Sequence, residues 1–326
     1  MRARTPSRAV LLSLSAAAII LCTWVFFLGF RDQPLDRTVS NVALSKTGKW
    51  FAAGTSQGLI TVWAKGRDTT PRRVSFPYGP LNDIQFSPDE RLLVIASSDL
   101  GIYAPEESVP PRLLRSDKRN YGTVRFSSDG QTLLVITAKG TIETLDLQSG
   151  ITRLTLCCST IYGDVGFSPD GQTIVNAGHW PRIWDAHSGK LLGWLTKKRE
   201  FHTFRPIAFD TAHDLVLMGS QDGRVYAWSL TTRQIFAMSH PHSEYVDTIA
   251  ILAKGWVAYA GFDKVVRLWN PYTGQEHSLA MAHPTSNLIV GPEGNSVIFG
   301  TAQGEVEFWD VEAEGKRLRA IAIPER

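Results

Sequence analysis

Cysteine is scarce in this sequence, and most of the chain has no surplus of one charge. The 326 residues include only Cys22, Cys157 and Cys158, which excludes a disulfide-rich scaffold and a four-cysteine zinc site. Residues 1–30 contain three arginines and no acid, while the rest of the chain has 31 basic and 31 acidic residues. Because a nucleic-acid surface needs a basic excess, we expect no nucleic-acid partner.

Motifs for catalysis and for cofactors are missing as well. The sequence has no Walker motif, dinucleotide-binding fingerprint, CxxC pair or HExxH. Residues 54–58 match G-x-S-x-G, but they lie at a turn between two expected strands, whereas a nucleophile needs a strand-to-helix elbow. His240, His242 and Glu244 have no cysteine or further carboxylate at ligand spacing. We therefore expect no enzyme, no cofactor and no metal.

One long apolar run lies near the N-terminus. Residues 9–30 have no formal charge and, as a helix, span about 33 Å, enough for a bilayer core of about 30 Å. The arginines before the run place residues 1–8 in the cytoplasm as a basic tail, with residues 31–38 as a linker on the far side. The prediction is a single-pass signal-anchor, and a cleaved signal peptide, with its shorter apolar region, is the alternative. None of the seven asparagines lies in a glycosylation sequon, which favours a bacterial periplasm or cell surface over a eukaryotic secretory lumen.

The rest of the chain repeats one phrase every 39 to 42 residues. Each copy has alternating apolar residues followed by a turn of Pro or Ser, Asp and Gly, as in DVGFSPDG, which indicates a strand and a tight turn. Each copy continues with a second, a third and a fourth short strand. The third strand of the copy ends in a bulky side chain. The opening apolar residues are Val42, Ile84, Val124, Val165, Ile207, Ile249 and Leu288. The bulky residues are Trp63, Tyr103, Leu145, Trp184, Trp228, Trp269 and Trp309.

Seven such units predict an all-β ring, because one four-stranded sheet cannot bury both of its faces. The phrases RIWD, YAWS, RLWN and EFWD in copies four to seven resemble the WD40 repeat, which implies a seven-bladed β-propeller over residues 39–326. The resemblance also implies a buried polar network, which only copy six approaches, with His242, Asp263 and Trp269. Cross-blade polar contacts are therefore expected to be few. We expect the ring to close by packing, with residues 316–323 as the last strand.

Propellers bind partners mainly through exposed loops, and aromatic residues there favour protein binding. The predicted partner-binding rim consists of Tyr162, His179, Trp180, Tyr245, Asp247 and Phe262. Packing between blades is the alternative role of these side chains. The predicted function is a membrane-anchored, non-catalytic scaffold that binds a protein or peptide. The alternatives are a carbohydrate or cell-envelope binder using Trp180 and Trp194, or an enzyme with its site at the central channel.

Overall fold

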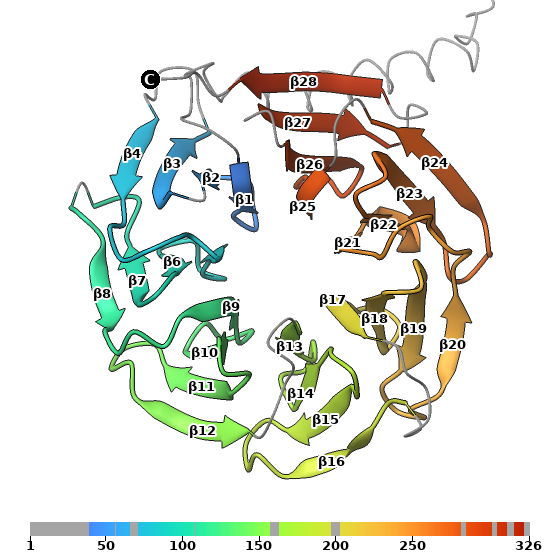
Figure 1. The fold of residues 1–326 in the computed structure, drawn as a ribbon, viewed down its shortest axis with the longest axis horizontal. Coiled ribbons are helices and arrows are strands. Elements are labelled where there is room, and N and C mark those ends of the chain that lie inside the picture. The colour runs from blue at the N-terminus through green and yellow to red at the C-terminus, as the bar shows by residue number, and fades with distance from the viewer. Residues whose placement is uncertain are drawn as a thin grey trace, which may run out of the picture.

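The computed structural model describes residues 39–55, 57–65, 71–107, 109–156, 163–196, 203–281, 285–301, 305–311 and 316–322. Seven four-stranded antiparallel sheets surround a central axis (Figure 1). In each sheet the strands follow chain order from the channel outward. The predicted seven-bladed, all-β propeller is confirmed, including blades two and three, whose Trp-Asp positions depart from the repeat.

The blades have similar strand lengths. Blade one contains β1 (Val39–Leu44), β2 (Trp50–Thr55), β3 (Leu59–Ala64) and β4 (Arg72–Ser75). Blade two contains β5 (Asp83–Phe86), β6 (Leu93–Ala96), β7 (Leu100–Tyr103) and β8 (Arg112–Arg115). Blade three contains β9 (Tyr121–Phe126), β10 (Thr132–Thr137), β11 (Ile142–Asp146) and β12 (Thr152–Leu156). Blade four contains β13 (Val165–Phe167), β14 (Thr173–Asn176), β15 (Arg182–Asp185) and β16 (Leu191–Trp194).

The remaining three blades complete the ring. Blade five contains β17 (Phe204–Asp210), β18 (Leu215–Ser220), β19 (Val225–Ser229) and β20 (Ile235–Met238). Blade six contains β21 (Thr248–Ile251), the short 3-10 helix η1 (Ala253–Gly255), β22 (Val257–Ala260), β23 (Val265–Trp269) and β24 (Glu276–Ala280). Blade seven contains β25 (Thr285–Val290), β26 (Ser296–Thr301), β27 (Glu305–Asp310) and β28 (Lys316–Ala322).

The repeated Ser-x-Asp-Gly sequence forms the turn between the first and second strands. In blade three, Ser127 Oγ donates to Asp129 Oδ1 at 2.5 Å and accepts from the Thr132 amide at 3.0 Å. The hydrogen bond from Ser127 lowers the pKa of Asp129. Gly130 follows with φ of 70°, a left-handed conformation that glycine adopts without steric cost. Side-chain hydrogen bonds and one glycine thus fix the register of the two strands.

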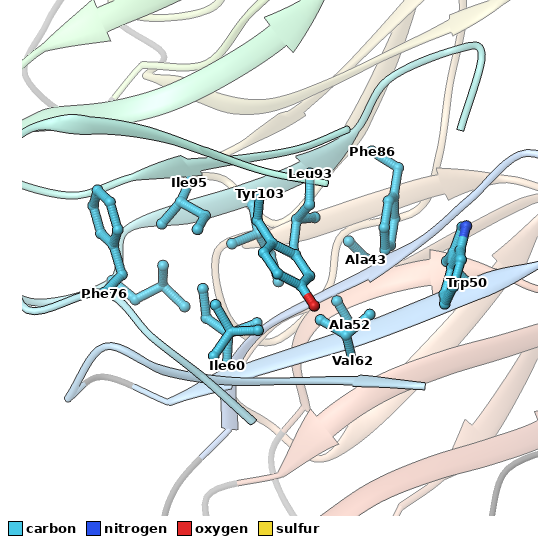
Figure 2. Packing of buried hydrophobic residues seen from close by; sticks show 13 residues of the cluster. Ala43, Trp50, Ala52, Ile60, Val62, Phe76, Phe86, Leu93, Ile95 and Tyr103 are labelled. Carbon is cyan, nitrogen blue, oxygen red and sulfur yellow. The ribbon is translucent and has the colours of Figure 1, made fainter. Parts of the chain in front are cut away.

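The core lies between neighbouring blades rather than inside any one of them. Figure 2 shows the cluster between blades one and two, where Phe76 and Tyr103 pack with Ile60 and Ile95. The bulky residue at the end of each third strand packs against the preceding blade in the same way. Trp228 joins a cluster with side chains of blade four, and Trp269 joins one with side chains of blade five. This position is therefore apolar in every repeat because it fills the gap to the previous sheet.

Blades one and seven close the ring through side-chain packing. β28 pairs with β27, so the last sheet contains four consecutive strands of the chain, as predicted. Phe51 stacks between Trp63 at 5.2 Å and Phe308 at 6.0 Å, measured between ring centroids. Val39 and Ile298 belong to the same buried cluster.

Candidate functional site

The start of β17 connects loops of the two blades beside it. Thr203, directly before the strand, lies with Oγ1 2.8 Å from Nδ1 of His179 in the β14–β15 loop. Arg205, on the strand, points the other way, and its Nη1 lies 3.5 Å from Oδ1 of Asp247, directly before β21. Loops of blades four, five and six therefore form one continuous stretch of the rim.

An aromatic pair covers the ion pair in this stretch. The rings of Tyr245 and Phe262 lie 5.4 Å apart, and the guanidinium of Arg205 lies 5.9 Å from the Tyr245 ring centroid. A Cβ atom on Gly261 would lie 2.4 Å from the Tyr245 carbonyl oxygen, so glycine is needed for the two loops to approach. Phe262 remains 49% exposed despite these contacts.

Charged and polar groups lie beside the aromatic pair and could contact a binding partner. Burial raises the pKa of Asp247, while the nearby Arg205 opposes that shift. Burial, followed by the charge of Asp247, also raises the pKa of Tyr245. The group therefore offers a hydroxyl, an ion pair and an exposed ring at the channel mouth. Among the described residues, no three His, Cys, Asp or Glu side chains lie close enough to hold a metal ion.

The structure thus brings together three of the six predicted rim residues, namely Tyr245, Asp247 and Phe262. Trp180 is exposed but turns to Trp194, with ring centroids 6.4 Å apart. Arg182 lies over the Trp194 ring, with Cζ 4.5 Å from the ring centroid, and so occupies one face of that ring. His179 reaches the others only through Thr203 and β17.

Some sequence predictions concern residues that lie outside the described part of the chain. Tyr162 of the predicted rim is one of them.

The predicted polar network of blade six is partly assembled. His242 is buried, with Nδ1 2.8 Å from Asp263 Oδ2 and Nε2 3.1 Å from the Val265 carbonyl oxygen. Burial lowers the pKa of His242, and the Val265 carbonyl and Asp263 oppose that effect. Trp269 packs in the apolar cluster between blades five and six. The three-residue network as a whole stays a prediction.

A central channel with a volume of about 650 Å³ is lined by the first strands of six blades and, in blade four, by Gly163 and Asp164 directly before β13. Arg125 of β9 bridges two carboxylates there: Nη1 lies 2.6 Å from Asp83 Oδ2, and Nη2 lies 3.1 Å from Asp164 Oδ1. Burial raises the pKa of Asp83, and Arg125 opposes that shift. Because Arg125 links carboxylates across three blades and offsets part of their charge, the contacts favour a structural role over catalysis.

Cross-blade polar contacts are more frequent than the sequence prediction allowed, so that prediction is wrong. Asp83 accepts from the Val124 amide at 3.1 Å, and Asp164 accepts from the Ile207 amide at 3.2 Å. Thr248 accepts from the Leu288 amide at 2.8 Å. The signal was present in the sequence: the residue before the opening apolar position is polar in six copies. These residues are Asn41, Asp83, Thr123, Asp164, Thr248 and Asn287.

Comparisons with known proteins agree with this architecture. No family model matches the chain. Periodic tryptophan protein 2 of Saccharomyces cerevisiae is 23% identical over 289 residues, which cover 84% of this chain and 31% of that protein. The ribosome biogenesis protein ytm1 of Botryotinia fuckeliana is 31% identical over 110 residues, 29% of this chain and 23% of the relative. The mouse NACHT domain- and WD repeat-containing protein 1 is 26% identical over 114 residues, 32% of this chain and 7% of the relative.

Together, the fold and these similarities define a seven-bladed β-propeller of the WD-repeat type. Within that class, the similarity to periodic tryptophan protein 2 runs through most of the chain. The chain spans less than a third of the length of each of these relatives.

The predicted localisation is wrong. The described residues contain no helix long and apolar enough to cross a bilayer. A relative named as a ribosome biogenesis protein also does not fit a single-pass membrane protein with its propeller outside the cytoplasm. The predicted tail, anchor and linker, residues 1–8, 9–30 and 31–38, lie outside the described residues.

Proposed function

We propose that this propeller is a non-catalytic scaffold that binds a protein segment at the channel mouth between blades five and six. The main support for this proposal is the exposed Phe262 ring, which lies beside Tyr245 and near the Arg205–Asp247 ion pair. An apolar ring beside hydrogen-bonding groups is typical of the residues that dominate protein interfaces.

The comparisons support a protein as the partner. One relative is named as a ribosome biogenesis protein, and another as a U5 small nuclear ribonucleoprotein 40 kDa protein. Both names describe assemblies of several components. The charge balance of residues 31–326 argues against direct binding of the nucleic acid in such an assembly. We therefore propose that the chain contacts a protein component.

Site-specific photocrosslinking tests this function. A benzoyl-phenylalanine replaces Phe262 in one version of the full chain, and Val109 in a control version. Val109 is also exposed, but it lies in the β7–β8 loop at the other end of the propeller. We expect a protein crosslink from position 262 and none from position 109.

Variants then measure the contribution of the aromatic pair. Binding of the recovered partner is expected to weaken at least tenfold in Phe262→Ala and in Tyr245→Ala, the effect of losing about 1.4 kcal/mol. Equal crosslinking from both positions, or unchanged affinity in both variants, would contradict the proposal. Circular dichroism of each variant verifies that the propeller is folded.

A further inference from the structure

The outermost strand of each blade is a sheet edge, and two of these edges differ from the others. Within the described residues, each such strand has a paired neighbour on one side only. Charged residues on an edge strand normally prevent it from pairing with another chain. Arg, Lys or Glu occurs in β4 (RRVS), β8 (RLLR), β12 (TRLTL), β24 (EHSLA) and β28 (KRLRAIA). β16 (LLGW) and β20 (IFAM) contain no charged residue.

These two strands also concentrate the exposed apolar side chains of the molecule. Seven of the eleven large hydrophobic residues that are exposed in the described chain lie on β16, on β20 or against them. They are Trp180, Leu191, Leu192, Trp194, Ile235, Phe236 and Met238. We call this set the lateral surface. Contiguous apolar surface of this kind on a monomer marks an interaction site more often than chance exposure does.

Blades four and five are neighbours in the ring, so the two parts of the lateral surface lie on adjacent blades (Figure 1). Arg233, two residues before β20, joins the two strands by donating from Nη1 to the Leu192 carbonyl oxygen at 2.8 Å. A Cβ atom on Gly193 would lie 2.5 Å from that same Nη1. Glycine at position 193 therefore leaves the space through which Arg233 crosses from one blade to the other.

Three basic side chains of the described residues lie at the lateral surface. Arg182 lies over the Trp194 ring, Arg233 lies between the strands, and the exposed Lys190 precedes β16. A second copy of this chain would bring these cations against one another, which is unfavourable in an interface. The charge favours a partner with acidic residues.

We propose that the lateral surface binds an extended segment of a partner protein that adds to the free edge of β20. Backbone hydrogen bonds to that edge would provide affinity, and apolar side chains of the segment would pack on Met238 and Trp194. Phe236, whose ring centroid lies 5.6 Å from that of Tyr272 in blade six, would offer a further apolar contact. Acidic residues flanking the apolar stretch would meet Arg182 and Arg233. This surface is separate from the channel mouth, so either proposal can fail without the other.

A displayed library of random nine-residue peptides tests this inference on the full chain. Selection uses the natural chain, and counter-selection uses the double variant Phe236→Glu and Met238→Glu. We expect the recovered peptides to alternate apolar residues and to contain Asp or Glu at an end. A synthetic peptide of that consensus should bind the double variant at least tenfold more weakly.

Two further variants make the test specific. Ile151→Glu changes an exposed apolar residue beside β12 in blade three and should leave binding unchanged. Arg233→Glu keeps the apolar residues and should weaken the acidic peptide more than a version of that peptide with Asn and Gln. Thermal melting confirms that each variant is folded. Failure to recover such peptides, equal binding to the double variant, or dimerisation of the natural chain through this surface in sedimentation would overturn the proposal.

Discussion

At the scale of single residues, Arg125 shows how a propeller with few repeat-type polar networks still connects its blades. Its guanidinium contacts carboxylates from the blades on both sides, at Asp83 and Asp164. Each carboxylate also accepts a backbone amide from the following blade, Val124 or Ile207. Arg125 therefore offsets part of the negative charge of two carboxylates that also accept hydrogen bonds from backbone amides of the following blades.

Replacing Arg125 with methionine should destabilise the protein by about 2–3 kcal/mol, because both partly buried carboxylates lose a charged hydrogen-bond partner. Urea unfolding followed by tryptophan fluorescence measures the change. Arg153→Met is the matched control. Arg153 lies on the outer strand β12 and forms an exposed ion pair with Asp146, so its replacement should change the stability little. Equal effects of the two substitutions would contradict this interpretation.

The sequence could have revealed part of this arrangement. A polar residue precedes the opening apolar position in six of the seven repeats, so its common role was predictable. Arg125 was not predictable in this way, because the equivalent position in other copies holds Ala43, Gly166 or Ile289. A residue that occurs once in a repeat protein carries no periodic signal, and its partners come from other blades.

At the scale of the element, some strands accept no added side-chain volume. Gly101 lies in β7, where a Cβ atom would lie 2.2 Å from the ring of Phe76. Phe76 is fully buried between blades one and two, as Figure 2 shows, so its ring cannot move away freely. Gly101 is thus a packing requirement of the blade interface.

Gly101→Ala should therefore cost about 1–3 kcal/mol through overpacking. Gly122→Ala is the control: it also lies in a strand, β9, but the nearest atom to its Cβ position is 3.7 Å away. We expect Gly122→Ala to stay within about 0.5 kcal/mol of the natural protein. Differential scanning calorimetry compares the two. A Gly101→Ala protein as stable as the natural one would show that Phe76 can repack.

Strands, turns and blade number could all be predicted from the repeat, because each depends on local alternation and turn residues. The direction of an exposed side chain could not. Trp180 lies in a rim loop by sequence position, yet it contacts Trp194 at the outer edge of the blade. That contact depends on how far β16 extends along β15, which the spacing of the repeat does not specify.

At the scale of the whole molecule, the ring is held where the first and last blades meet by apolar side chains such as Phe51 and Phe308. No strand exchange supplements this packing within the described residues. The contact between blades one and seven must therefore be comparable to the other inter-blade contacts for the ring to unfold as a unit.

Phe308→Ala should cost about 3–5 kcal/mol, the usual effect of removing a buried phenylalanine ring. We expect a lower urea midpoint with a single transition, detected equally by fluorescence and circular dichroism. Two separated transitions would show instead that the ring opens between blades one and seven before the remaining blades unfold.

The localisation error has a cause at this same scale. The prediction of a membrane span depended on residues 9–30, and its orientation on the arginines before them; neither segment carries information about the propeller that follows. The fold was predictable because its signal is repeated seven times, whereas a single apolar run is one observation.

The chain enters and leaves the ring in adjacent blades, with blades one and seven beside each other and blade four on the far side (Figure 1). A partner segment lying along β20 would thus approach from a different sector than any polypeptide attached before residue 39 or after residue 322. The propeller would then lie between two components of a larger complex, one reached through blades one and seven and the other bound at blade five.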